Sequence, residues 1–447
     1  MTSFLLEPAT RRRIFLGSLF SLMLSAIFYV AGYFGFGYNI FGYLFLGQDT
    51  FSDFLQSTLF AELYYNPGLG DDVNSGFSQP LGPPLIFYYL AIRRVFPSFD
   101  VYTQAEMPII LAGLILLALM ALLFTLLLLI TRNPLFSLLL VFSHPIIFIV
   151  GRGNPDILLC ILFSLFIILQ SKNKELLSAT VLSLMIATKL PLVIFVTIFL
   201  YRRQLKGFVL APTLATIFFF GSLTFRPFVV SEQFATFRIV TDRYFRDYVI
   251  GDGGTLFNNS LFGLIKSLFY LIFGSSLDSV SDLVEMNTNL SRYYWGLILV
   301  LIFLFLTYLI SNLGGKKSFS TSFLLKGIQE IDWSEILFVL TILFILIPNI
   351  SAEYRLGFLI VSFAGLYSRN SSLLARKEFL ALFFITLIPK HFIIFEDSLQ
   401  VFGTFTFASI INPTLLLTLL FLTLNILKSR IRFTYSSDRI KIKGQKN

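Results

Sequence analysis

Acidic and amide side chains gather at a few points of a strongly apolar chain, and their spacing indicates chemistry at a membrane surface. Asp49 and Asp53 lie four residues apart, just after the first long apolar segment, so a helix would present both on one face. A carboxylate held beside a bilayer costs free energy and is by default a functional-site hypothesis. Because a carboxylate near a hydroxyl group can act as a general base, the sequence predicts an acid of this kind, with Asp53 as the principal candidate.

Cations and further polar residues recur beside predicted helix breaks, on the same inferred side of the membrane as Asp53. Arginine can bind a phosphate through two parallel hydrogen bonds, and lysine supplies a point charge. An acid and several cations on one side suit group transfer from a lipid phosphate. We interpret the following as candidate substrate-binding residues: Asp49, Arg152, Asn154, Asp156, Lys189, Asn259, Glu353, Tyr354 and Arg355.

Purely structural roles remain open for these residues. Asn154-Pro155-Asp156 is also a good helix start, because Asn caps helices and Pro suits the first turn. Lys189 could extend its ammonium group to the membrane interface, and Glu353 could pair with Arg355. Asp53 itself could be a helix cap.

The composition identifies an integral membrane protein. Of the 447 residues, 56% are hydrophobic and 13% are charged, whereas soluble domains carry about 25% charged residues. The net charge of +9 is interpreted as an excess of basic residues in cytoplasmic loops, and no nucleic-acid partner is expected. One cysteine excludes an internal disulfide, and two histidines are too few to indicate a zinc site; we expect no metal and no cofactor.

The apolar segments predict one all-α polytopic membrane domain over residues 1–447, with about 11–13 membrane segments of the roughly 20-residue spanning length or shorter. Arg11, Arg12 and Arg13 precede the first span, which places the N-terminus in the cytoplasm. The predicted parts are a first span at 14–34, an external loop at 35–83 carrying the candidate acid, a helical core at 84–224, a second external loop at 225–258, C-terminal helices at 259–428 and a basic cytoplasmic tail at 429–447.

Two places in the helical core depart from simple spans. Counting 133–151 as a full span would put Ser171-Lys172-Asn173-Lys174 outside, against the positive-inside rule. A short or re-entrant segment there resolves the conflict, although a full span remains open. Thr188-Lys189-Leu190-Pro191 should end a helix, because proline disfavours its continuation.

Several of these stretches, in this order, resemble the GT-C superfamily of membrane glycosyltransferases, and in particular glycosyltransferase family 87 of the polyprenyl-phosphate-mannose-dependent type. Arg152 departs from the Gln that is common in that family, and an Arg followed by an acid is similar to other GT-C members. The resemblance is carried by Asp53-Phe54, Tyr65-Asn66-Pro67, Gly82-Pro83-Pro84, Pro145, Gly151-Arg152-Gly153-Asn154, Ala187-Thr188-Lys189-Leu190-Pro191, Asn258-Asn259-Ser260 and Pro348-Asn349-Ile350-Ser351-Ala352-Glu353-Tyr354.

The resemblance implies a GT-C helical core with interfacial helices in the first external loop. It implies metal-independent, inverting transfer of mannose or another hexose from a polyprenyl-phosphate donor to a lipid or glycan acceptor, with Asp53 as the base. The protein would be a multi-pass plasma (inner) membrane enzyme surrounded by membrane lipids, with its active site on the periplasmic or extracellular side.

Three other functions stay open at this point. A polysaccharide polymerase or ligase is also polytopic with a large external loop, and Arg238, Arg243 and Arg246 would suit one. A lipid or sugar transporter usually shows paired repeats, and we find no internal repeat. A non-enzymatic assembly subunit is the third.

Overall fold

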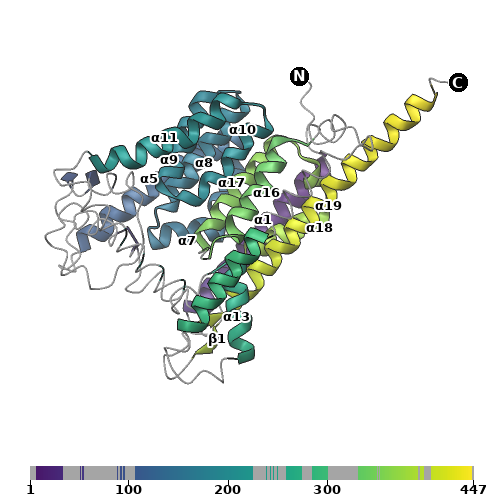
Figure 1. Cartoon of the computed structure of the whole chain (residues 1–447). Helices are drawn as coiled ribbons and strands as arrows, with labels where there is room; N and C mark the ends of the chain where they lie inside the picture. The colour runs from purple at the N-terminus through teal and green to yellow at the C-terminus, as the bar shows by residue number, and fades with distance from the viewer. Residues whose placement is uncertain are drawn as a thin grey trace.

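The computed structural model shows a mostly helical chain with one short two-stranded sheet (Figure 1). Helices of mainly apolar residues recur along its length, which confirms the predicted all-α polytopic class. The structure describes residues 7–33, 51, 53–54, 88, 91–92, 94–95, 106–224, 238, 242, 245, 249, 258–273, 284–300, 331–349, 351, 353–390, 393–396 and 404–444.

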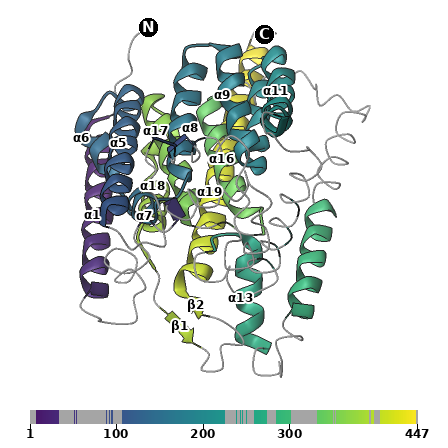
Figure 2. The same cartoon turned by 90° about the vertical axis from the view of Figure 1, so that its left-hand side faces the viewer.

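The elements follow one another from the N-terminus at one end of the molecule to the long C-terminal helix, which returns to that end (Figure 2). Residues 284–300 are also helical. The α-helices are α1 (Pro8–Tyr33), α5 (Glu106–Thr131), α6 (Pro134–Val141), α7 (His144–Arg152), α8 (Asp156–Ser171), α9 (Glu175–Thr188), α10 (Thr197–Tyr201), α11 (Leu205–Thr224), α13 (Leu261–Phe273), α16 (Trp333–Leu346), α17 (Leu356–Ser368), α18 (Lys377–Thr386) and α19 (Phe407–Gly444). The 3-10 helices are η4 (Leu190–Val196), η7 (Glu353–Arg355) and η8 (Ser372–Ala375), and the strands are β1 (Ile393–Glu396) and β2 (Thr404–Thr406).

Among the described residues, three helices are long and apolar enough to cross a membrane: Pro8–Ala31, Ile110–Thr131 and Phe407–Arg430. A fourth span results if α6 and α7, which meet at an angle of 53°, are counted as one broken segment. The remaining apolar helices are 10–17 residues long, which is shorter than the roughly 20 residues needed for a perpendicular crossing. With this bend, α6 and α7 form either one broken span or a re-entrant segment.

The helix ends in this region follow local rules. Asn133 caps α6, since its side chain accepts a hydrogen bond from the backbone N–H of Phe136 at 3.0 Å, and Pro134 occupies the first turn, which is typical of a helix start. Gly153 ends α7 in the left-handed conformation at φ +67°, the usual role of glycine at a helix C-terminus. Helix α9 ends at Thr188, as the Lys189-Leu190-Pro191 stretch predicts.

Close helix packing brings α17 against α7 and α8. A methyl group built on Gly357 would lie 2.7 Å from Cδ1 of Ile149 and 2.9 Å from Sγ of Cys160, so the absence of a side chain at Gly357 favours this close approach. Deeper in the core, the rings of Phe363 and Phe383 stack with centroids 3.8 Å apart. Aromatic packing of this kind stabilises a membrane bundle mainly through van der Waals contact.

The prediction of C-terminal helices over 259–428 was wrong in part. Helix α18 ends at Thr386 and the chain then forms β1, which pairs antiparallel with β2. Pro389 cannot continue a helix, and the Ile393-Ile394-Phe395 sequence favours a strand. Helix α19 in turn continues beyond residue 428, the predicted end of the C-terminal helices, to Gly444.

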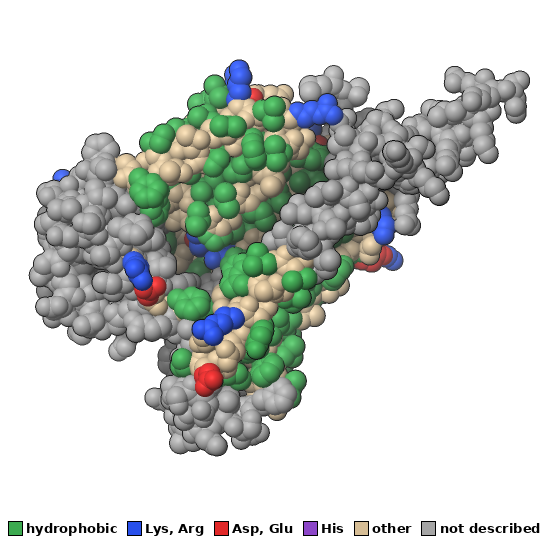
Figure 3. Space-filling view, viewed as in Figure 1, with side chains coloured by type: hydrophobic (Ala, Val, Ile, Leu, Met, Phe, Trp, Pro, Cys, Tyr) green, Lys and Arg blue, Asp and Glu red, His purple; other side chains and the backbone are tan. Residues whose placement is uncertain are grey.

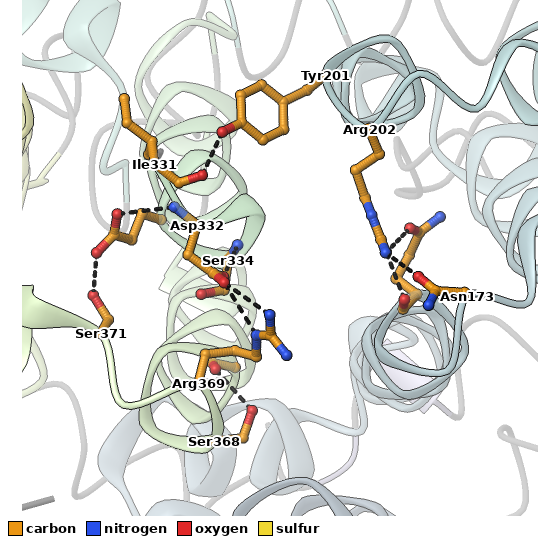
Figure 4. Close-up of polar contacts among 12 residues, drawn as sticks. Asn173, Tyr201, Arg202, Ile331, Asp332, Ser334, Ser368, Arg369 and Ser371 are labelled. Carbon is orange, nitrogen blue, oxygen red and sulfur yellow. Dashed lines mark hydrogen bonds and ion pairs between the residues drawn. The ribbon is translucent and has the colours of Figure 1, made fainter. Parts of the chain in front are cut away.

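Helices α8, α9, α16 and α17 alternate in direction and carry polar residues at both ends. At one end lies a group that we call the distal cluster: Gln170, Asn173, Arg202, Asp332, Glu335, Arg369, Ser371 and Arg430 (shown in part in Figure 4). Arg202 donates to the Gln170 side chain at 2.5 Å and lies over the Trp333 ring at 5.2 Å. These contacts join the α8–α9 hairpin to α16.

Buried charge is neutralised within the distal cluster. Glu335 is 1% exposed; its carboxylate accepts hydrogen bonds from Arg430 at 2.8 and 2.9 Å and from Ser371 at 2.6 Å. Asp332 caps α16 through the backbone N–H of Ser334 at 2.9 Å and accepts from Arg369 at 3.0 Å (Figure 4). All partners of these carboxylates come from the same end of the bundle, so this cluster fastens α16, α17 and α19 together.

Candidate functional site

At the opposite end of the same helices, the predicted base is held by two of the predicted substrate-binding residues. The Asp53 carboxylate accepts a hydrogen bond from Nη2 of Arg152 at 2.7 Å and from Nδ2 of Asn154 at 2.8 Å. Asp53 is 3% exposed, whereas the Arg152 side chain keeps 20% exposure. The cation therefore faces outward from a buried carboxylate, in a position where a second anion can approach it.

The segment that carries Asp53 docks on the end of α7. The backbone N–H of Phe51 donates to the carbonyl of Gly151 at 2.9 Å. A methyl group on Gly153 would lie 2.5 Å from Cβ of Phe54 and 3.2 Å from its backbone nitrogen. Phe51 has φ +56°, a conformation that bulky residues seldom adopt. A strained backbone held in this way is typical of functional sites.

A second ion pair lies beside the first. Nζ of Lys189 donates to both carboxylate oxygens of Asp156, at 2.7 and 2.8 Å. The two pairs are connected, because Oδ1 of Asn154 accepts from the backbone N–H of Asp156 at 3.0 Å. As in the first pair, the carboxylate is buried at 2% and the cation is partly exposed at 27%. In both pairs, therefore, a partly exposed cation lies outside a buried carboxylate.

Tyr354 and Arg355, in η7, complete this arrangement. The Tyr354 ring stacks on Phe148 of α7 with centroids 5.1 Å apart. Burial raises the pKa of the Tyr354 phenol well above its usual value, and the negative charge of Asp53 raises it further, while Arg152 opposes the shift. The phenol therefore stays protonated beside this carboxylate.

Arg355 is 7% exposed. Its guanidinium lies over the Phe344 ring at 5.0 Å and donates to the Phe344 carbonyl at 3.4 Å. Partial burial lowers the pKa of the Lys189 ammonium, the Asp156 carboxylate opposes that shift and the positive charge of Arg355 adds to it. Arg355 is thus close enough to Lys189 for their charges to interact.

Asn259 is hydrogen-bonded to the segment that precedes η7. Its backbone N–H donates to the carbonyl of Ser351 at 2.6 Å, three residues before Tyr354. Two other predicted residues are not placed in this way: Asp49 lies outside the described residues, and Glu353 is placed in η7 by its backbone alone. The structure thus brings together Asp53, Arg152, Asn154, Asp156, Lys189, Asn259, Tyr354 and Arg355.

Two residues that build the site, Asn258 and His144, were not among the predicted site residues. Asn258 crosslinks two loops and His144 contacts Tyr29, with the phenol oxygen 2.5 Å from Nδ1 of His144. His144 is fully buried at the start of α7 and so supports the helix that carries Arg152. The available signal for Asn258 was its place in the Asn258-Asn259-Ser260 stretch of the family resemblance; no local pattern pairs Tyr29 with a residue 115 positions away.

A hollow lies beside α7, below the bundle formed by α8 to α11, and Lys or Arg side chains line its floor (Figure 3). The surfaces around it are largely apolar (Figure 3), which suits a lipid-bearing substrate. Within the described part of the chain, no three His, Cys, Asp or Glu side chains gather as metal ligands do. The chemistry that these residues can support is proton removal by a carboxylate next to cations that stabilise a leaving phosphate.

A model of glycosyltransferase family 87 matches residues 81–317, more than half of the chain. The matched range includes Arg152, Asn154, Lys189 and Asn259, whereas Asp53 precedes it. No curated protein and no solved structure matches the chain.

Proposed function

Because the chain belongs to glycosyltransferase family 87, we propose that it transfers a hexose from a polyprenyl-phosphate donor to a hydroxyl group of a lipid or glycan acceptor. The observation that carries the proposal is the buried Asp53 carboxylate held by Arg152 and Asn154 at 2.7 and 2.8 Å. A general base must be fixed in position and kept from bulk water, and these contacts do both.

The reaction forms one bond and breaks one. The acceptor oxygen attacks the anomeric carbon of the donor sugar from the face opposite the phosphate, and Asp53 takes the proton of the acceptor hydroxyl. The bond between the anomeric carbon and the phosphate oxygen breaks, its electron pair leaves with polyprenyl phosphate, and the sugar configuration inverts. Arg152 and Lys189 supply positive charge for the leaving group, as cationic groups do in other transfers.

The exposures of the ion pairs support this division of roles. Arg152 and Lys189 keep 20% and 27% of their side chains exposed, while Asp53 and Asp156 keep 4% and 2%. A phosphate entering from the hollow would meet the cations first. It would weaken the hold of Arg152 on Asp53, so that donor binding prepares the base for the acceptor.

Replacing Asp53 tests the proposal directly. Asn preserves shape and removes basicity, and loss of a general base costs roughly 10²–10⁴-fold. We expect Asp53→Asn to turn over a labelled polyprenyl-phosphate hexose at least about a hundredfold more slowly while binding it normally. Asp332→Asn, in an ion pair with Arg369 at the other end of the bundle, is the matched control and should retain activity.

Wild-type turnover by Asp53→Asn would refute the proposed base. Long-chain glycan products from wild type would favour the polymerase or ligase reading instead. We also expect activity to survive EDTA; loss on chelation with rescue by magnesium would point to a diphosphate donor.

A further inference from the structure

Two loops near the proposed active site are bound to each other by hydrogen bonds from two side chains and the backbone. We call residues 258–260, before α13, together with Asn349 and Ser351, after α16, the asparagine clasp. Asn258 donates to the carbonyl of Asn349 at 3.0 Å and accepts from the backbone N–H of Ser351 at 2.9 Å. Ser260 also donates to the Asn349 carbonyl, at 2.9 Å. The clasp is therefore a built structure whose backbone is fixed without any help from Asn259 side-chain atoms.

The clasp nevertheless holds polar atoms that have no partner among the described residues. Both amide atoms of Asn259, Oδ1 of Asn349 and Oγ of Ser351 are buried and make no hydrogen bond there. Asn259 and Ser351 are 1% and 0% exposed. An unsatisfied buried polar group costs about 1–3 kcal/mol, and native proteins keep few of them. Four such atoms in one place indicate a site that a polar ligand fills.

The clasp is continuous with the proposed active site. Ser351, Tyr354 and Arg355 belong to one short segment, in which Tyr354 lies at Asp53 and Arg355 lies near Lys189. The clasp itself contributes no charged group: its free atoms are amide and hydroxyl donors and acceptors. A neutral set of this kind does not compete with cations for a phosphate, but it matches hydroxyl groups, each of which both donates and accepts.

We propose that the asparagine clasp is the subsite that binds sugar hydroxyl groups, with the Asn259 amide as its principal contact. This inference rests on the proposed function, because it assigns a sugar to the same site. The hydroxyl groups belong to the donor hexose or to a sugar of the acceptor, two sources that share one chemistry. Specificity at such a site is strong, since a substrate that lacks the hydroxyl leaves buried polar atoms unpaired.

The variant Asn259→Leu tests the inference, because Leu has nearly the shape of Asn without its polar atoms. Since the Asn259 amide makes no hydrogen bond in the described structure, its loss should leave the melting temperature in detergent unchanged or higher. Binding of polyprenyl monophosphate, which carries no sugar, should also stay unchanged. Binding of polyprenyl-phosphate hexose, or the KM for the acceptor, should worsen on the order of tenfold.

The two readouts identify the source of the hydroxyl groups: weaker hexose-donor binding assigns the clasp to the donor, and a raised acceptor KM assigns it to the acceptor. Asn258→Leu is the matched control, and it should lower the melting temperature because it removes the bonds that join the loops. Wild-type values for both substrates in Asn259→Leu would overturn the inference and indicate that water fills the clasp. If wild-type protein transferred no hexose at all, the proposed function would fail first and the clasp assignment with it.

Discussion

At the scale of single residues, the site consists of two buried carboxylates, each held by a partly exposed cation. Burying ions costs free energy that their mutual attraction often fails to recover, so a buried pair is weak evidence for stability. Asn154 contacts the carboxylate of one pair and the backbone of the other, which fixes their relative positions. The two ion pairs are therefore better explained by phosphate binding than by a contribution to folding stability.

The Lys189–Asp156 pair allows the structural and functional roles of a cation to be separated. Lys189→Gln leaves Asp156 buried without its partner, so we expect stability to fall by about 3 kcal/mol, the lower end of the cost of breaking a buried pair. Adding Asp156→Asn removes that unpaired charge and should restore most of the stability. Donor affinity should stay at least about tenfold weaker in the double variant, because the phosphate still lacks its cation.

Chemical denaturation and donor titration on the same preparations measure both quantities. If the double variant recovered donor affinity together with stability, Lys189 would be a structural residue and not part of the phosphate site.

The sequence predicted the chemical types of the site residues better than their partners. Asp53, Arg152, Asn154 and Lys189 were all identified as candidates, because polar residues are conspicuous in an apolar chain. Arg152 and Asp53, however, make a contact across 99 positions. The pairing suggested by the sequence was a local one, between Glu353 and Arg355. Contacts such as that of Arg152 with Asp53 are set by tertiary packing, which local spacing does not encode.

At the scale of elements, the break between α7 and α8 positions the chemistry. Arg152 ends α7, Gly153 turns the chain, and Asn154 precedes α8, so that one tight turn supplies both residues that hold Asp53. The bend of 53° between α6 and α7 interrupts the helical segment that leads to this turn. Such irregular backbone at membrane depth is tolerated where protein buries it or it lines a cavity.

Gly153→Ala should separate the Asp53 segment from this turn. Its methyl group would lie within 2.5 Å of Phe54 Cβ, and φ +67° costs a non-glycine residue roughly 1–2 kcal/mol. We expect turnover to fall about as far as in Asp53→Asn, roughly a hundredfold, with the rest of the bundle intact by circular dichroism. Gly296→Ala, where the added methyl meets nothing within 4 Å, is the control and should match wild type. Full activity of Gly153→Ala would show that the Asp53 segment does not need this close approach.

Element boundaries were predictable wherever proline, glycine or a cap marked them. The end of α9 at Thr188 follows from the Lys189-Leu190-Pro191 signal, whereas the short or re-entrant segment at 133–151 was expected from the positive-inside rule. The β1–β2 sheet was missed because an apolar run of this length reads equally as a helix or a strand, and its partner strand lies beyond a loop.

At the scale of the whole molecule, the two polar clusters lie at opposite ends of the same helices. The distal cluster adjoins many basic residues, including Lys172, Lys174, Arg203 and Arg376, whereas the proposed site contains balanced ion pairs. The positive-inside rule places the basic end in the cytoplasm. We therefore propose that the site, and with it the hollow beside α7, opens on the external side.

Cysteine labelling on intact cells tests this sidedness. Cys160 is the only cysteine in the sequence and is fully buried, so the wild-type protein should react little with an impermeant thiol reagent and gives a clean background. Ser171→Cys lies at an exposed position at the distal end and should label only after the cells are permeabilised. Ser75→Cys and Ser231→Cys, in the two loops predicted to be external and outside the described residues, should label without permeabilisation.

Each of the three cysteine positions serves as a control for the labelling of the other two. Labelling of Ser171→Cys on intact cells, with Ser75→Cys protected, would reverse the orientation and put the ion pairs of Asp53 and Asp156 on the cytoplasmic side. Different results for Ser75→Cys and Ser231→Cys would separate the two loops and contradict an active site covered by both. If all three behave as expected, we infer that the partly exposed Arg152 and Lys189 meet a lipid-phosphate donor that is presented on the external leaflet.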